Sequence, residues 1–124
     1  FNAHSFTSML LKNKGNGWFE IANLPIQAQF SPTLSFETHD INNDGFLDVF
    51  GVGNIFDAEV ETIRYDASKG YVLLGNETGS LYYIKDSSYF NDSDAKAINK
   101  IVINKAVHFI ILNKNNNLKI LKLK

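Results

Sequence analysis

The chain has no cysteine among its 124 residues and no apolar run close to the length of a membrane span. The lack of cysteine excludes disulfides, thiolate nucleophiles and zinc–thiolate sites. A transmembrane helix needs about 18–20 consecutive apolar residues, so no membrane span is expected. The chain begins at Phe1 with no signal-like segment, so we expect a processed product or a cut piece of a longer protein.

Signatures of catalysis are also missing. The sequence has no G-x-S-x-G, P-loop or H-E-x-x-H motif, and its histidines, His4, His39 and His108, are isolated from one another. His108 lies in an apolar run and is interpreted as a hydrogen-bonded sheet residue. His39 precedes an acidic segment and is a candidate support for it. The sequence therefore predicts no catalytic residue.

Basic residues are unevenly distributed. Neither lysine nor arginine occurs between Lys14 and Arg64, whereas residues 100–124 hold six lysines and no acidic residue. A basic tail can indicate nucleic-acid binding. Over 118–124, however, the lysines alternate with apolar residues, which is typical of a half-buried strand, and edge lysines discourage aggregation. We expect a solvated strand face here and no nucleic-acid partner.

What the chain does contain is short, β-rich apolar runs separated by Gly, Asn and Asp clusters. This pattern favours strands and hairpins, and about nine strands in 124 residues indicate an all-β, antiparallel architecture. Residues 56–69 show no clear period and are expected to form a long excursion, and residues 85–95 a polar linker. The predicted strands are Phe6–Leu11, Trp18–Ala22, Leu34–Thr38, Leu47–Val52, Tyr71–Leu74, Leu81–Ile84, Ile98–Ile103, Val107–Leu112 and Leu118–Leu123.

A hairpin pattern recurs along the chain. Segments 9–18, 72–81 and 109–118 each contain an apolar strand, a polar turn rich in Asn or Gly, and a second strand. Residues of these types adopt the positive φ angles that tight turns require. Three similar hairpins predict stacked sheets, none of which buries its faces alone.

The most informative segment is D-I-N-N-D-G-F-L-D at residues 40–48. Alternate side chains of a tight loop converge on its inner side, and a glycine in the middle permits the sharp turn. Hard oxygen donors of this kind suit Ca²⁺, which takes six to eight of them, better than Mg²⁺. A cation would also offset the repulsion among three neighbouring carboxylates. The alternative is an ordinary acidic turn, because Asp and Asn favour turns. The candidate metal ligands are Asp40, Asn42, Asp44, the carbonyl of Phe46 and Asp48.

This loop is not an EF-hand. An EF-hand loop needs a bidentate Glu at its twelfth position and a helix on either side. The twelfth position here is Gly51, and both flanks have the pattern of strands. An apolar strand, the acidic loop and then L-D-V-F-G-V-G at 47–53 together resemble the FG-GAP/VCBS repeat of integrin-α-like β-propellers. The resemblance implies that the loop joins the first two strands of a propeller blade and binds calcium through the five residues above.

The resemblance also divides the chain. One full blade is expected at 33–85, a partial blade hairpin at 1–32, and a terminal three-strand unit without a calcium loop at 96–124. Closed propellers need at least four blades, so about two and a half blades predict a carboxy-terminal piece of a larger propeller. If the chain stands alone, we expect it to cover its open sheet edges either with a homodimer partner or by forming a compact open sandwich.

Two functions follow from these expectations. The first is a non-catalytic, calcium-stabilised module of an extracellular, cell-surface or periplasmic protein, which presents loops to a protein or glycan partner. Extracellular modules bind calcium at roughly 10⁻⁴–10⁻³ M, an affinity suited to that location. The alternative is a fragment of a propeller enzyme, a polysaccharide lyase or hydrolase, whose active site lies across missing blades. The excursion at 56–69 is the longest loop, and we interpret it as an exposed loop with an internal Glu–Arg pair.

Overall fold

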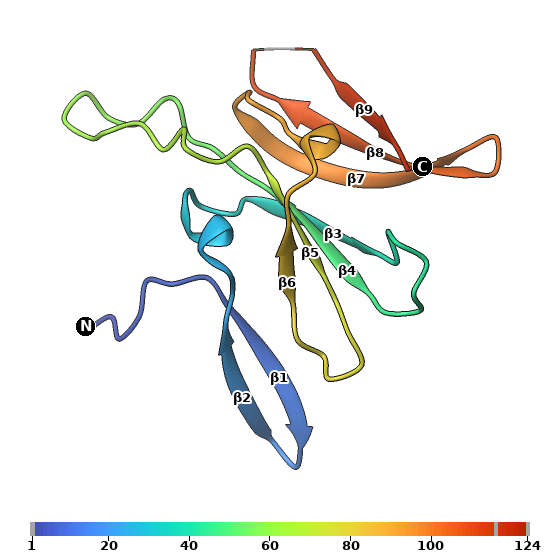
Figure 1. Cartoon of the computed structure of the whole chain (residues 1–124). Coiled ribbons are helices and arrows are strands. Elements are labelled where there is room, and N and C mark those ends of the chain that lie inside the picture. The colour runs from blue at the N-terminus through green and yellow to red at the C-terminus, as the bar shows by residue number, and fades with distance from the viewer. Residues whose placement is uncertain (1, 116, 124) are drawn as a thin grey trace.

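The computed structural model describes residues 2–115 and 117–123. Within these residues nine strands pair into three antiparallel sheets, with two short 3-10 helices between strands (Figure 1). This confirms the all-β fold class. The strands are β1 (Met9–Gly15), β2 (Trp18–Asn23), β3 (Ser35–His39), β4 (Asp48–Val52), β5 (Tyr71–Leu74), β6 (Tyr82–Ile84), β7 (Ala95–Ile103), β8 (Ala106–Asn113) and β9 (Lys119–Lys122); the helices are η1 (Ile26–Gln29) and η2 (Ser87–Tyr89).

The first sheet is the hairpin β1–β2. Its turn places Gly15, Asn16 and Gly17 at φ angles of 85°, 51° and 79°. Glycine and asparagine tolerate this left-handed region better than other residues, which is why the polar turn could be recognised in the sequence. The strand was predicted to begin at Phe6, but it begins at Met9, and Phe6 is 94% exposed.

The central sheet contains β3, β4, β5 and β6 in the order of the sequence. Because neighbouring strands run antiparallel, the connections alternate between the two ends of the sheet. The β3–β4 and β5–β6 connections lie at one end, which we call the acidic-loop end. The β4–β5 connection and the segment from β6 to β7 lie at the other, which we call the long-loop end.

The third sheet has the order β7–β8–β9. Asn104 and Lys105 form the β7–β8 turn at φ angles of 50° and 64°, which is the pattern of a tight hairpin. In β9 the prediction of one solvated lysine face is wrong in detail, because the lysines lie on both faces of the strand. Lys119 and Leu121 alternate with Ile120 and Lys122, so each face of the strand carries one lysine and one apolar residue. Lys119 lies on the more covered face and donates to the Phe90 carbonyl.

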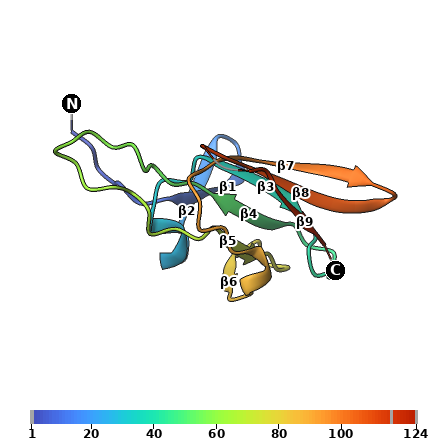
Figure 2. The ribbon, with the colours of Figure 1, turned by 90° about the horizontal axis from the view of Figure 1, so that it is seen from above.

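The main hydrophobic core lies between the central and third sheets. Phe50 of β4 and Phe109 of β8 are fully buried and meet edge to face, with ring centroids 5.3 Å apart. The opposite face of the central sheet packs Tyr71 and Leu73 against Ala28 of η1. Strands β4 and β5 are therefore covered on both faces, which explains their nearly continuous apolar sequences. In Figure 1 the central sheet lies between the other two, and in Figure 2, seen from above, the third sheet overlaps it.

The two flanking sheets leave apolar side chains on their outer faces. Leu11 and Ile21, which are cross-strand partners in the first sheet, are 55% and 64% exposed. Leu112 and Ile120 on the outer side of the third sheet are about half exposed. Contiguous apolar surface of this kind commonly marks a contact with another element or protein. Within the described residues, no helix has the length and apolar character that crossing a membrane requires.

Candidate functional sites at the two ends of the central sheet

The acidic loop connects the end of β3 to the start of β4. His39 and Asp48 are cross-strand neighbours, so the loop closes a ladder of paired residues. Inside it, Asn43 and Gly45 adopt φ angles of 60° and 89°. Two left-handed positions so close together fold the chain back on itself, as expected for the glycine in the middle of the motif.

The predicted ligand side chains turn toward the backbone of their own loop. Asp40 accepts from the N–H of Asp44 (3.0 Å) and, through its other oxygen, from the N–H of Gly45 (2.8 Å). Asn42 Oδ1 accepts from the same Asp44 N–H at 3.2 Å, and Asn42 Nδ2 donates to Asp44 Oδ2 at 2.8 Å. Asp44 Oδ1 accepts from the N–H of Phe46 at 2.9 Å. The structure thus brings Asp40, Asn42 and Asp44 together around one set of amides.

Asp48 has a different environment. Its side chain is fully buried, and it accepts from the N–H of Ile41 through Oδ2 (2.7 Å) and from the N–H of Gly75 through Oδ1 (2.8 Å). Gly75 follows β5, so this carboxylate ties the acidic loop to the β5–β6 connection. A buried charge is tolerated only when it is well hydrogen-bonded. Asp48 is therefore a structural element of this end of the sheet, whether or not it also binds a metal.

Backbone N–H groups offset the negative charge of the loop carboxylates, and the sequence did not reveal this. Five backbone N–H groups, those of Ile41, Asp44, Gly45, Phe46 and Gly75, donate to their oxygens. Successive amides that point inward form a site with partial positive charge. Repulsion among the carboxylates is thus eased by the backbone, and a cation is not the sole means of offsetting it.

The chemical type of the proposed donors suits calcium, but the side chains are too far apart to form a complete site. Every proposed donor is a hard oxygen, and a carboxylate oxygen that accepts one N–H keeps a second lone pair. Metal-binding carboxylates are themselves usually hydrogen-bonded. Among the described residues, however, no three His, Cys, Asp or Glu side chains are grouped closely enough to hold a metal ion. Calcium would need to draw Asp40, Asn42 and Asp44 closer to Asp48, and the Phe46 carbonyl stays a predicted ligand.

At the long-loop end, the base of the 56–69 excursion is held by a small antiparallel bridge. Ile55 and Tyr65 exchange two backbone hydrogen bonds, of 2.8 and 3.0 Å. The next pair outward is Phe56 and Arg64, and the guanidinium carbon of Arg64 lies 4.6 Å from the centre of the Phe56 ring. The expected Glu–Arg pair is not what the structure describes: Arg64 contacts Asp66, at 3.9 Å.

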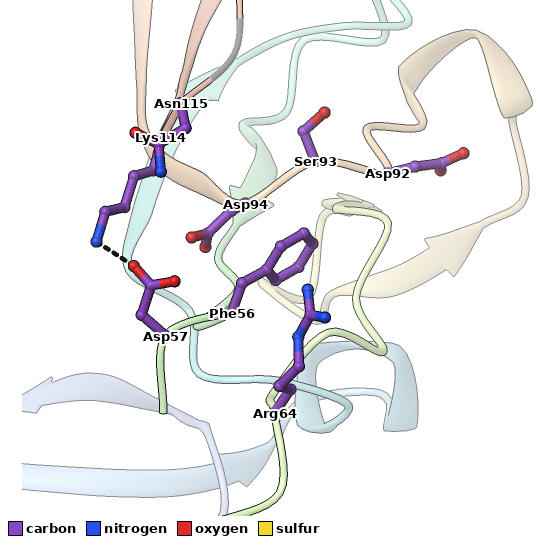
Figure 3. A pocket seen from close by; sticks show the side chains of 8 residues that line it. All are labelled: Phe56, Asp57, Arg64, Asp92, Ser93, Asp94, Lys114 and Asn115. Carbon is purple, nitrogen blue, oxygen red and sulfur yellow. Dashed lines mark hydrogen bonds and ion pairs between the residues drawn. The ribbon is translucent and has the colours of Figure 1, made fainter. Parts of the chain in front are cut away.

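Two ion pairs lie at this end of the sheet. Lys114 of the β8–β9 turn binds Asp57 of the long loop (Figure 3). The hydrogen bond and charge of Lys114 lower the pKa of Asp57, and the same contact raises the pKa of Lys114. Lys96 Nζ lies 2.6 Å from Asp94 Oδ1 and donates to the Asn54 carbonyl at 2.7 Å. Asp94 is almost completely buried.

Asn54 is an important residue that the sequence interpretation missed. It follows β4, is 1% exposed, and its side chain donates to the carbonyls of Ser68 and Ser93 and accepts from the Ser68 N–H. Asn54 therefore fastens the end of the long loop and the start of β7 to β4. An amide side chain between Gly53 and Ile55, inside an otherwise apolar stretch, is the signal that could have identified it.

Comparison with protein-family models, with curated proteins and with solved structures found no match to this chain. The resemblance noted in the sequence therefore rests on the acidic loop and the strand that follows it. Function has to be argued from the geometry of the two ends of the central sheet.

Proposed function

We propose that this chain is a non-catalytic, calcium-stabilised β-repeat module of propeller type, which belongs to an exported or cell-surface protein and presents loops to a protein or glycan partner. The observation that carries the proposal is the acidic loop. Asp40, Asn42 and Asp44 gather their oxygens on one side of a loop that closes a strand pair. Calcium is the common ion whose ligand preference matches such a set.

The role assigned to calcium is structural. Asp48 already links the loop to Gly75, so an ion held by Asp40, Asn42, Asp44 and Asp48 would fix the β3–β4 and β5–β6 connections to each other. Such an ion supplies charge neutralisation and a rigid cross-link at the acidic-loop end. It lies at the opposite end of the sheet from the long loop, and it therefore supports the scaffold rather than recognition.

The arrangement of the sheets supports the propeller-type part of the proposal. A four-stranded sheet with strands in sequential order packs one face on the next sheet along the chain and the other on the preceding segment. Propeller blades stack in this way, and each depends on its neighbours to cover its faces. The exposed apolar faces of the two flanking sheets are the surfaces that further blades, or a homodimer partner, would cover.

The test is thermal unfolding in millimolar calcium and in chelator. With a dissociation constant of roughly 10⁻⁴–10⁻³ M, 10 mM calcium stabilises the folded state by about 1.4–2.7 kcal/mol. We expect the midpoint to rise by several degrees for a domain of this size. Magnesium at the same concentration should produce a smaller rise, because it requires stricter octahedral geometry.

The matched variants are Asp44→Ala, in the loop, and Asp66→Ala, an exposed carboxylate at the other end of the sheet. Both remove one negative charge, so a general electrostatic effect of calcium would change equally in the two. We expect the calcium-dependent rise to disappear in Asp44→Ala and to persist in Asp66→Ala. A midpoint that is the same in calcium and in chelator would contradict the calcium part of the proposal.

A further inference from the structure

The long-loop end of the central sheet contains a cavity of about 480 Å³. Its walls come from three connections that are distant in sequence: the β4–β5 excursion, the segment that leads into β7, and the β8–β9 turn (Figure 3). Pockets that bind small molecules commonly enclose about 300–1,000 Å³. The residues that give the cavity its chemistry are Phe56, Asp57, Arg64, Asp92, Asp94 and Lys114.

The floor of the cavity is Asp94. Its side chain is 5% exposed, and Lys96 Nζ lies 2.6 Å from its buried Oδ1. The Asp94 carbonyl accepts from the N–H of Lys114, and Asn54 holds the preceding carbonyl of Ser93. The Asp94 backbone is thus held on both sides, and its carboxylate has a second oxygen with which to accept a hydrogen bond.

One wall is formed by Phe56 and Arg64. The Ile55–Tyr65 bridge makes them cross-strand neighbours, which explains why the guanidinium lies over the ring. Figure 3 shows the Phe56 ring at the centre of the lining, between Asp94 and Arg64. The pair supplies an apolar surface beside a group of N–H donors, in an orientation that the backbone fixes.

The charges of the lining are balanced. Each of the three carboxylates among the described lining residues is paired with a lysine: Asp57 with Lys114, Asp92 with Lys69, and Asp94 with Lys96. Arg64 adds a guanidinium to the lining. An anionic or cationic ligand would meet groups of its own sign as well as the opposite sign, and like charges disfavour binding. A neutral polyol has no such penalty, because each hydroxyl both donates and accepts and so satisfies either kind of group.

We propose that this cavity is a binding site for a neutral carbohydrate, one or two sugar rings of a glycan. An apolar face of the sugar packs on the part of the Phe56 ring that Arg64 does not cover, and its hydroxyls bind the Asp94 and Asp57 carboxylates, Arg64 and Lys114. This assignment deepens the recognition part of the proposed function and rests on it. It requires no calcium at the cavity, which lies at the opposite end of the sheet from the acidic loop.

The experiment is titration of the full chain with neutral mono- and disaccharides up to tens of millimolar, followed by amide chemical shifts in NMR spectra. A charged panel, a uronic acid and an amino sugar, is run beside it. We expect saturable shifts with at least one neutral saccharide, centred on residues 55–57, 64 and 92–94. Phe56→Ala and Arg64→Ala should each weaken binding roughly tenfold or more.

Controls separate the cavity from general effects. Phe6→Ala removes an exposed ring elsewhere, and Glu59→Gln removes a carboxylate of the same loop that does not line the cavity. Both should bind like the parent. Arg64 is more than half exposed, so its variant should fold, and a parent-like thermal midpoint verifies this. Binding that survives both Phe56→Ala and Arg64→Ala, or binding of the charged sugars alone, overturns the assignment.

All titrations are repeated in chelator, so that a failure of the cavity proposal can be distinguished from a failure of the calcium proposal. If no neutral saccharide shifts these residues while calcium still raises the thermal midpoint, the cavity assignment fails and the calcium-stabilised module stands. If a saccharide binds and the midpoint does not respond to calcium, the metal proposal fails and the cavity assignment stands.

Discussion

A fully buried polar side chain lies at each end of strand β4, and the two side chains satisfy their hydrogen bonds with different kinds of partner. Asp48 begins the strand, and Asn54 lies just beyond its last residue; they are 0% and 1% exposed. Asp48 is an acceptor only and binds two backbone N–H groups. Asn54 both donates and accepts, and it binds two carbonyls and one N–H.

The difference follows from what each end has to hold. At the acidic-loop end the surrounding groups are amides with partial positive charge, and a carboxylate is the best match for them. At the long-loop end the segments present two carbonyls and one N–H to Asn54, and an amide side chain, with two N–H donors and one oxygen acceptor, matches all three. The acidic-loop end is thus a candidate for a cation, whereas Asn54 holds the long-loop end through uncharged hydrogen bonds and supports the cavity.

The largest effect is expected for Asp48→Ala, measured by denaturant unfolding in chelator so that calcium contributes nothing. The change leaves two N–H groups without acceptors, each at about 1–3 kcal/mol, so the loss should be roughly 2–6 kcal/mol. Asp48→Asn retains one acceptor oxygen and should lose less. Asp44→Ala is the control, because its side chain is exposed and binds only within its loop. Equal losses in Asp48→Ala and Asp44→Ala would show that Asp48 does not tie the two connections together.

Asn54→Ala should have the second largest effect, about 1–3 kcal/mol of unfolding free energy. The loss is smaller than at Asp48 because no charged hydrogen bonds are involved and water can reach part of the loop carbonyls. Asn99→Ala, at an exposed position in β7, is the matched control and should be within about 0.5 kcal/mol of the parent. A larger loss at Asn54 than at Asp48 would reverse the comparison between the two ends.

The independence of the two ends can be tested with Gly75→Ala. A Cβ at Gly75 would lie 2.3 Å from the Leu47 carbonyl oxygen, so the backbone must move, at about 1–3 kcal/mol. Because the Gly75 N–H donates to Asp48, the backbone shift in Gly75→Ala displaces the donor whose acceptor Asp48→Ala removes, so the two changes act on the same contact. Their combined loss should fall short of the sum by roughly 0.5–3 kcal/mol, whereas Gly75→Ala with Asn54→Ala should be additive. Additivity in both double variants would contradict the contact assigned to Gly75.

Much of this fold was predictable because its signals are local. Strand β5 was predicted with its observed bounds, and the hairpin turns were marked by Asn and Gly at positive φ. The acidic loop was found because its residues are contiguous. The cavity was not predicted, since Phe56, Asp94 and Lys114 meet only after three connections fold together. The tie between Asp48 and Gly75, 27 residues apart, was missed for the same reason.

The smallest effect concerns the ion pair between Asp57 and Lys114, which fastens the long loop to the β8–β9 turn without burial. Lys114 lowers the pKa of Asp57 below its ordinary value of 3.8, so this stabilisation is present above that pH and is lost as the pH falls through the lowered value. The pKa of Lys114 is raised above 10.5, so its contribution to stability is present below that pH and is lost as the pH rises through the raised value.

The thermal midpoint of Asp57→Asn should therefore lie slightly below the parent's near pH 7 and approach it at both extremes of pH. Because exposed pairs contribute little and salt screens them, the difference should shrink further in 1 M NaCl. A difference as large as that of Asn54→Ala, or one that persists at pH 2, would mean that Asp57 stabilises this end through contacts other than Lys114.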